Sequence, residues 1–314
     1  SLPWNQWPPD LRDRNPKTLK QLSSQYSRQI EKEGFVQFIL YRQWHNLKQY
    51  CNHKNIKIIG DMPIYLSGDS AEVWSHPHFF KLDPQGQPTQ VAGVPPDYFC
   101  SQGQLWGNPV YRWDRLKGDR YQWLIDRFTH NFKLFDITRI DHFRGLVSYW
   151  EIPASEKNAV KGTWVKAPVY DFLDTLISRQ GSLPIIAEDL GYITDDVREV
   201  LKHYGFANMK ILLFAFGQDN HPYLPHHYPP HCYVYTGTHD NNTAVGWFKH
   251  EALPSERARL SRYTGKRINS LNVNWELIRL AMQSVASTCI IPMQDVLGLD
   301  SQARMNLPAT LGTN

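Results

Sequence analysis

The sequence lacks several features by which common classes of protein are recognised. No stretch approaches the 18 or so consecutive apolar residues of a membrane-spanning helix, and the most apolar runs, 35–41 and 211–216, have the length of core segments. The 34 Lys and Arg residues nearly balance the 30 Asp and Glu residues, so no excess of basic charge indicates a nucleic acid partner. We therefore expect a soluble protein that binds neither membrane nor nucleic acid.

Cysteine is scarce, and three common motifs are missing. Cys51, Cys100, Cys232 and Cys289 lie far apart, without the close pairs of zinc sites or disulfide frameworks, so we expect reduced, buried thiols. The chain has no G-x-G-x-x-G turn, no Walker A sequence and no G-x-S-x-G turn. These absences give no support to a nucleotide cofactor or to a Ser-His-Asp hydrolase, and we expect no cofactor.

Short β-branched runs alternate with helical patterns over most of the chain. The runs predict six strands, over 56–59, 133–140, 183–187, 209–214, 232–235 and 288–291. Helical spacing predicts helices over 121–132, 169–178, 195–204 and 274–285, and two leading helices within 16–53 that are split at Gly34. Alternation of this kind is typical of parallel βαβ units, so we expect an α/β fold.

Acidic residues lie at or near the carboxyl ends of the predicted strands: Asp61, Asp141, Glu188 and Asp240. A (β/α)₈ TIM-type barrel places its active site at this end of its strands. An open doubly wound sheet, which shares this property, is the alternative. We predict a single catalytic barrel domain over 1–314, with 62–118 and 142–167 as long inserted loops or subdomains.

The predicted barrel shows six strands where eight are required, and its first two strands are the ones that we do not find. We therefore expect it to be incomplete at the N-terminus. Such a barrel would expose two unpaired sheet edges, so we expect the isolated chain to fold poorly.

The segment 138–145 places a basic residue near an acidic one. Side chains alternate along a strand, so Arg139 and Asp141 point to the same side. The guanidinium stabilises the charged form of the neighbouring carboxyl group, which keeps Asp141 ionised as a nucleophile. A purely structural Arg–Asp pair is the alternative.

Two adjacent acids follow the apolar run 183–187. Only one of Glu188 and Asp189 can face a site from a strand, and apolar neighbours would raise the pKa of Glu188 so that it donates a proton near neutral pH. The alternative is that Glu188 or Asp189 caps the helix that begins near Thr194.

A third polar cluster follows 232–235 and contains His239, Asp240 and Asn241, which together can hydrogen-bond neighbouring hydroxyl groups. A metal site would also use His and Asp, but further ligands at suitable spacing are missing, and we expect no metal. Three acids at strand ends suit glycosyl transfer. In a retaining enzyme the nucleophile and the acid, here Asp141 and Glu188, would lie about 5 to 5.5 Å apart.

Several blocks in order carry a family resemblance. They are GDMPIY at 60–65, VAGVPPDYF at 91–99, WGNP at 106–109, RIDHFRG at 139–145, YWEIPA at 149–154, AEDLG at 187–191 and GTHDN at 237–241. From about Trp4 to Asn306 the chain resembles amylomaltase, the 4-α-glucanotransferase or disproportionating enzyme family (glycoside hydrolase family 77) of the α-amylase clan.

The resemblance implies a (β/α)₈ barrel that transfers α-1,4-glucan segments to the 4-hydroxyl of another glucan or of glucose, with retention. By the same resemblance Asp141 is the nucleophile, Glu188 the general acid/base and Asp240 the third acid, while Arg139 fixes Asp141 and His239 and Asp61 contact the sugar. The segment 93–108, with Tyr98, Phe99, Trp106 and Asn108, resembles the lid over the substrate groove. Packing within the loop is the alternative for Trp106.

Two other functions remain open from the sequence. One is an α-glucan hydrolase of the amylase type, and the other is a truncated, inactive glucan-binding fragment. The resemblance implies a cytoplasmic protein, or a plastid protein if the source is a plant or alga.

Overall fold

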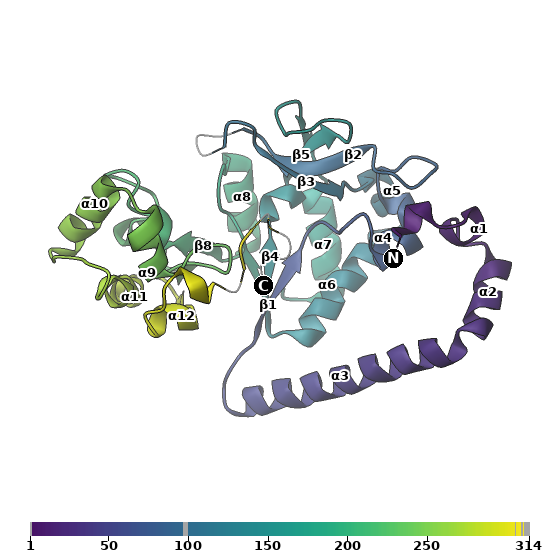
Figure 1. The fold of residues 1–314 in the computed structure, drawn as a ribbon, viewed down its shortest axis with the longest axis horizontal. Helices are drawn as coiled ribbons and strands as arrows, with labels where there is room; N and C mark the ends of the chain where they lie inside the picture. The colour runs from purple at the N-terminus through teal and green to yellow at the C-terminus, as the bar shows by residue number, and fades with distance from the viewer. Residues whose placement is uncertain (1, 97–99, 305, 309, 311–314) are drawn as a thin grey trace. The chain divides into compact units, whose positions relative to one another are not determined.

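The computed structural model describes residues 2–96, 100–304, 306–308 and 310 (Figure 1). They form two compact units, of which the first comprises Ser1–Glu188 and Ile193–Tyr204, and the second comprises Asp189–Tyr192 and Gly205–Asn314. Each unit contains parallel strands that alternate along the chain with helices. The α/β class predicted from the sequence is therefore confirmed.

A parallel sheet of order β1-β4-β7 lies in the first unit. Its strands are β1 (Ile59–Pro63), β4 (Ile137–Asp141) and β7 (Ile185–Ala187). The register places Asp61 opposite Arg139 and Pro63 opposite Asp141. Strand β1 begins three residues later than the sequence predicts, so Asp61 lies within the strand, whereas Asp141 ends β4 and Glu188 directly follows β7.

Five helices accompany these strands. They are α4 (Ala71–Ser75), α5 (Trp113–Gly118), α6 (Gln122–Leu134), α7 (Val169–Gln180) and α8 (Asp195–Tyr204). Apolar residues at helical spacing bury one face of α6 and one face of α7, and the rings of Phe128 and Phe172 meet edge to face with centroids 5.4 Å apart. Helix α6 contacts both β1 and β4 and therefore packs against the sheet that carries Asp61 and Asp141.

Parts of the two long segments 62–118 and 142–167 pair with each other. They form an antiparallel sheet of order β3-β2-β5-β6, with β2 (Gln90–Val94), β3 (Gln104–Pro109), β5 (Ser148–Pro153) and β6 (Thr163–Lys166). Val91, Ile152 and Ala159 form a small buried cluster against which Trp150 packs. The sheet therefore has an apolar core of its own.

The second unit is built on a parallel sheet of order β10-β9-β8. Its elements are β8 (Asn208–Ile211), β9 (Cys232–Tyr235), α9 (Ala244–Gly246), α10 (Pro254–Thr264), α11 (Val273–Gln283), β10 (Thr288–Ile290) and α12 (Met293–Val296). Buried Asp295 accepts hydrogen bonds from Thr236 Oγ1 at 2.5 Å and from the Ala244 N–H at 2.7 Å. These bonds hold the segment that follows β9.

All six strands predicted from the sequence are present.

The leading helices differ from the prediction. They are α1 (Pro9–Arg12), α2 (Pro16–Gln25) and α3 (Ser27–His53). Helix α3 continues through Gly34, and the break lies at Tyr26. Serines around Tyr26 weaken the helix there, because their side chains compete for backbone hydrogen bonds, whereas an isolated glycine costs a helix only about 1 kcal/mol.

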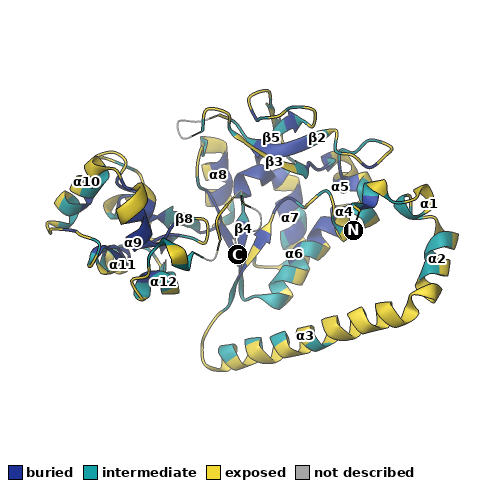
Figure 2. Ribbon diagram, viewed as in Figure 1, coloured by how far each residue is buried: buried dark blue, intermediate teal, exposed yellow. Residues whose placement is uncertain are grey.

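Most of α3 is exposed (Figure 2), although Trp44 Nε1 donates to the Leu134 carbonyl at the end of α6. In the described part of the chain no helix, α3 included, is long and apolar enough to cross a membrane.

The four cysteines are free thiols, but their burial differs from the expectation. Cys232 lies on the central strand β9 and is buried, whereas Cys51, Cys100 and Cys289 are only half-buried. The expectation of burial is wrong for these three, because Cys51 lies on the sparsely packed α3, Cys100 lies in a loop, and Cys289 lies on the edge strand β10.

Two glycine substitutions should change stability in opposite directions. A β-carbon at Gly60 would lie 2.0 Å from the Phe135 ring, so Gly60→Ala should lower the free energy of unfolding by about 1–3 kcal/mol. A β-carbon at Gly34 would meet nothing within 4 Å, so Gly34→Ala should raise it by up to about 1 kcal/mol. Urea unfolding followed by circular dichroism measures both changes.

The control for the clash is the double variant Gly60→Ala/Phe135→Leu, which should recover part of the loss. A Gly60→Ala protein as stable as the parent would contradict the described packing of Gly60 against Phe135.

Candidate active site

Two acids of the first unit share one arginine. Arg139 Nη1 lies 2.6 Å from Asp61 Oδ1 and 2.9 Å from Asp141 Oδ1. The register explains this arrangement, because Asp61 on β1 lies opposite Arg139, and Asp141 follows two residues later on the same side of β4. The predicted contact between Arg139 and Asp141 is therefore confirmed, and Asp61 is a second partner that the sequence did not indicate.

Charge and burial act in opposite directions on this arginine. Burial lowers the pKa of Arg139, but the negative charges of Asp61, Asp141 and Glu188 outweigh it, and the pKa rises above its usual value. The Arg139 side chain is 8% exposed, whereas the side chains of Asp61 and Asp141 are 42% and 46% exposed. The arrangement therefore presents two open carboxylates held by a permanently charged, buried guanidinium.

Glu188 is buried next to this pair. Its Oε2 accepts a hydrogen bond of 2.8 Å from the backbone N–H of His142, the residue after Asp141. The Glu188 N–H donates to the Ile140 carbonyl at 3.0 Å, and the Phe143 N–H donates to the Glu188 carbonyl at 3.1 Å. These bonds continue the pairing of β4 and β7 beyond Ala187. They bring the Glu188 carboxyl group next to the backbone that follows Asp141.

The neighbouring Asp189 has a different role, as part of the second unit. Its Oδ1 accepts a hydrogen bond of 2.9 Å from the Met209 N–H in β8, so the alternative of a helix cap is wrong for this residue. Burial raises the pKa of Asp189 to about 6, against the opposing effects of the Lys210 charge and of the Met209 N–H. The raised pKa predicted for Glu188 stays a prediction.

His239 and Asp240 also lie in the second unit, after β9. His239 Nε2 lies 3.4 Å from Asp240 Oδ2, and Asp240 Oδ1 accepts a hydrogen bond of 2.9 Å from Asn306 Nδ2. Asn241 Oδ1 accepts from the Thr238 N–H at 2.8 Å and closes the turn. The side chains of His239 and Asp240 are about half exposed. Among the residues that the structure describes, no three His, Cys, Asp or Glu side chains are grouped closely enough to hold a metal ion.

The predicted lid is described in part. Tyr98 and Phe99 lie outside the described residues, whereas Trp106 and Asn108 lie on β3. The Trp106 side chain is exposed, and its ring meets the His142 ring edge to face with centroids 4.7 Å apart. Strand β3 therefore lies beside the residue that follows Asp141.

Two residues of the site were missed by the sequence analysis. His142 has a left-handed backbone with φ of 49°, which no feature of the sequence signals. Arg144 is buried, its guanidinium lies 3.9 Å from the centre of the Trp164 ring, and its Nη1 donates to Thr194 Oγ1 at 3.0 Å. A basic residue between apolar neighbours was the available signal for Arg144.

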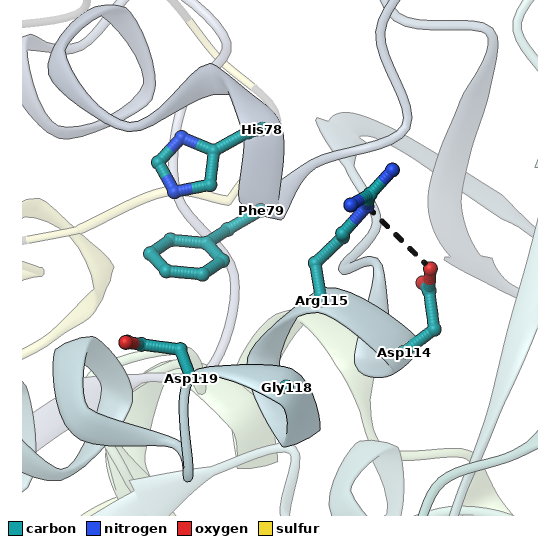
Figure 3. Close-up of a pocket in the computed structure, with 6 residues that line it drawn as sticks. All are labelled: His78, Phe79, Asp114, Arg115, Gly118 and Asp119. Atoms are coloured by element: carbon teal, nitrogen blue, oxygen red, sulfur yellow. Dashed lines mark ion pairs between the residues drawn. The ribbon is translucent and has the colours of Figure 1, made fainter.

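An open hollow of about 480 Å³ in the first unit is a separate feature (Figure 3). It is lined by His78, Phe79, Asp114, Arg115, Gly118 and Asp119, which come from the 3₁₀ turn Pro77–Phe79, from α5 and from the residue after α5. Arg115 Nε lies 3.8 Å from Asp114 Oδ2 across its rim. None of the predicted site residues lines this hollow, so it is not the candidate site.

Comparison with known proteins decides the family. The sequence model described as 4-alpha-glucanotransferase matches residues 1–314. This chain belongs to that family. It is 48% identical to the 4-alpha-glucanotransferase of Thermus thermophilus over 98% of this chain and 63% of the relative. It is 47% identical to that of Synechocystis sp. over 99% of this chain and 62% of the relative.

Solved structures agree with this assignment. The amylomaltase from Streptococcus agalactiae in complex with acarbose superposes with a TM-score of 0.94 at 39% identity, over 100% of this chain and 63% of that chain. The amylomaltase from Corynebacterium glutamicum, 18% identical, superposes with a TM-score of 0.74 over 88% of this chain and shares the fold. The chain spans less than two thirds of the length of these relatives. The resemblance stated from the sequence blocks is confirmed.

Asp189 should make the stability of the protein depend on pH. Its folded pKa of about 6 exceeds its usual 3.8, so the folded state binds more protons between these values. Its stabilising contribution is therefore present below about pH 4 and lost as the pH rises through 6. Asp189→Asn keeps an acceptor for the Met209 N–H and removes the charge, so it should raise the free energy of unfolding at pH 8 by up to roughly 3 kcal/mol.

Urea unfolding of both proteins at pH 4.5 and pH 8 measures this effect. Asp219→Asn, at an exposed acid of the same unit, is the matched control and should change stability little at either pH. Loss of stability at pH 8 in Asp189→Asn would mean that attraction to Lys210 outweighs the burial of the charge.

Proposed function

We propose that this chain carries the catalytic centre of a 4-α-glucanotransferase, which moves an α-1,4-glucan segment to the 4-hydroxyl of another glucan or of glucose. The observation that carries the proposal is the sharing of Arg139 by Asp61 and Asp141, with Glu188 held at the end of the neighbouring strand. Membership of the family and the acarbose complex of the Streptococcus agalactiae relative support it.

The proposed architecture is a (β/α)₈ barrel that forms one catalytic domain, with 62–118 and 142–167 as inserted segments. Parallel pairing of β1, β4 and β7, and of β8, β9 and β10, supports a barrel. The position of Asp141 at the carboxyl end of β4, and of Glu188 just beyond β7, supports an active site at that end.

In the first half of the proposed reaction, an oxygen of the Asp141 carboxylate attacks the anomeric carbon of the donor. The bond between that carbon and the departing 4-oxygen breaks, and Glu188 gives its proton to that oxygen. The departing glucan leaves as an alcohol, and the donor segment stays on Asp141 as a β-glycosyl ester. Arg139 Nη1, 2.9 Å from Asp141 Oδ1, holds the nucleophile in position before the attack.

In the second half, the 4-hydroxyl of an acceptor attacks the same carbon. Its proton passes to the Glu188 carboxylate as the bond to Asp141 breaks, so both acids return to their starting states. Two inversions at one carbon give net retention. We assign Asp61, His239 and Asp240 to contacts with the hydroxyls of the donor sugar, and Trp106, Asn108, Tyr98 and Phe99 to the lid that favours a sugar over water as acceptor.

The proposed partners are a glucan donor and a glucan or glucose acceptor. The plant relatives from Oryza sativa and Arabidopsis thaliana are described as chloroplastic/amyloplastic. We place the enzyme in the cytoplasm, or in the plastid if its source is a plant or alga.

Incubation with maltotriose as the only substrate tests the proposal. A transferase yields glucose and a ladder of longer oligosaccharides, and we expect this pattern on chromatography. Asp141→Ala should lower the rate by about 10⁴-fold or more, because no other carboxylate replaces the nucleophile. Asp114→Ala, an exposed acid of the separate hollow, is the matched control and should keep full activity.

Shortening of maltotriose without longer products would favour an α-glucan hydrolase, and glucan binding without any reaction would favour a silent binding protein. More than trace activity in Asp141→Ala would refute the nucleophile.

Glu188→Gln should distinguish the acid from the nucleophile. A 4-oxygen of glucose needs a proton to depart, whereas fluoride does not, so the rate with maltotriose should fall about 10²- to 10⁴-fold. The first turnover of α-maltosyl fluoride should fall far less. Fluoride release in a rapid-mixing experiment measures that turnover, and equal losses with the two donors would count against an acid role for Glu188.

A further inference from the structure

His142 has an unusual backbone at an important place. It follows Asp141 and precedes the buried 3₁₀ turn Phe143–Leu146, and its φ of 49° and ψ of 52° are left-handed. Residues other than glycine adopt this conformation rarely, because the β-carbon approaches the following carbonyl group. The turn lets two successive N–H groups bind Glu188, that of His142 at the carboxyl group and that of Phe143 at the carbonyl group.

The side chain of His142 connects this backbone to the lid strand. Its ring meets the Trp106 ring edge to face, with centroids 4.7 Å apart and planes at 88°. Its Nε2 is buried and has no hydrogen-bond partner among the described residues. Burial and the charge of Arg144 lower the pKa of His142 to about 4, so the ring is neutral at neutral pH and acts there by contact.

Little free space surrounds the His142 ring. A β-carbon at Gly145 would lie 3.1 Å from His142 Cδ2 and 3.2 Å from the Tyr65 hydroxyl. The Tyr65 ring lies 6.3 Å from the Trp106 ring, and its buried hydroxyl has no hydrogen-bond partner among the described residues. Trp106, whose side chain is 37% exposed, forms the open side of this cluster of Tyr65, Trp106 and His142.

We propose that His142 is a positioning residue that couples Trp106 on β3 to the acid/base Glu188. Its backbone holds the Glu188 carboxyl group, and its ring is held in turn by Trp106. An acceptor glucan that rests on Trp106 therefore steadies the group that must take its proton, whereas water gives no such contact. The inference rests on the proposed function and gives a physical reason why transfer to a sugar is favoured over hydrolysis.

The first test needs no enzyme activity. Amide hydrogen exchange of the His142 N–H, resolved by NMR in the whole protein, reports how firmly this group is held. Glu188→Ala removes the acceptor and should speed exchange at least about 10-fold. Trp106→Ala should speed it similarly if the ring contact holds the turn. Leu105→Ala, at the neighbouring exposed position of β3, is the matched control and should leave it unchanged.

An unchanged exchange rate in Trp106→Ala would overturn the coupling. Because this readout is independent of turnover, it decides the coupling between Trp106 and the His142 turn even if the protein proves to have another activity.

The second test compares His142→Gly, Trp106→Ala and the double variant with maltotriose. Glycine accepts the left-handed backbone and removes only the ring, so kcat should fall about 10- to 100-fold, and more of the glycosyl-enzyme should be hydrolysed by water for each transfer to a sugar. If His142 and Trp106 act through one coupling, the double variant should lose no more activity than the more impaired of the two single variants. Trp106→Phe, which keeps an aromatic face, should restore part of the transfer, and the first turnover of α-maltosyl fluoride should be largely kept in His142→Gly.

Three results would contradict the proposal: losses that multiply in the double variant, equal losses with maltotriose and the fluoride, or an unaltered ratio of transfer to hydrolysis. If the parent protein forms no ladder from maltotriose, the proposed function fails, and the exchange experiment alone decides the coupling.

Discussion

Arg139 projects from the central strand of a parallel sheet and meets carboxylates from its own strand and from β1. A buried guanidinium is tolerated only when it is paired, and Arg139 is paired with two carboxyl groups. A slip of one residue between β1 and β4 would turn Asp61 to the opposite face and leave Arg139 with one partner. The charges of the site and the register of the sheet therefore depend on each other.

The charge balance of these side chains would change during the proposed reaction. Before the reaction, the single guanidinium of Arg139 contacts two carboxyl groups, those of Asp61 and Asp141. Formation of the ester would use the carboxylate of Asp141, and Arg139 would then be paired with Asp61 alone. Glu188, whose carboxyl group accepts the His142 N–H, is the group that would donate the proton in the first step and accept it in the second.

The sequence allowed the six strands, most of the helices and the contact between Arg139 and Asp141 to be predicted, because each depends on local periodicity. The pairing of Asp61 with Arg139 depends on register between distant strands, which a single sequence does not define. For the adjacent acids Glu188 and Asp189, the alternation of side chains along a strand indicated that only one of them faces a site. It did not indicate which backbone N–H group each carboxyl group would bind. The split at Gly34 was wrong because one glycine is a weak breaker in a long helix, and the left-handed turn at His142 is fixed by tertiary bonds to Glu188.

The antiparallel sheet shows how long segments can supply precise contacts. Residues 62–118 depart from the end of β1 and residues 142–167 from the end of β4, and the two pair through β2 and β5. Each segment forms an antiparallel strand pair of its own, and the pairing of β2 with β5 adds hydrogen bonds between the segments and an apolar core to which both contribute, which offsets the conformational entropy lost on ordering them. Strand β3 extends this sheet by pairing with β2, so Trp106 is carried on a hydrogen-bonded strand, not on a free loop. Because β3 already holds the Trp106 ring against the His142 ring, Trp106 would lose little conformational freedom on binding a sugar in the proposed reaction. Such preorganisation is required of a group that positions Glu188 through His142.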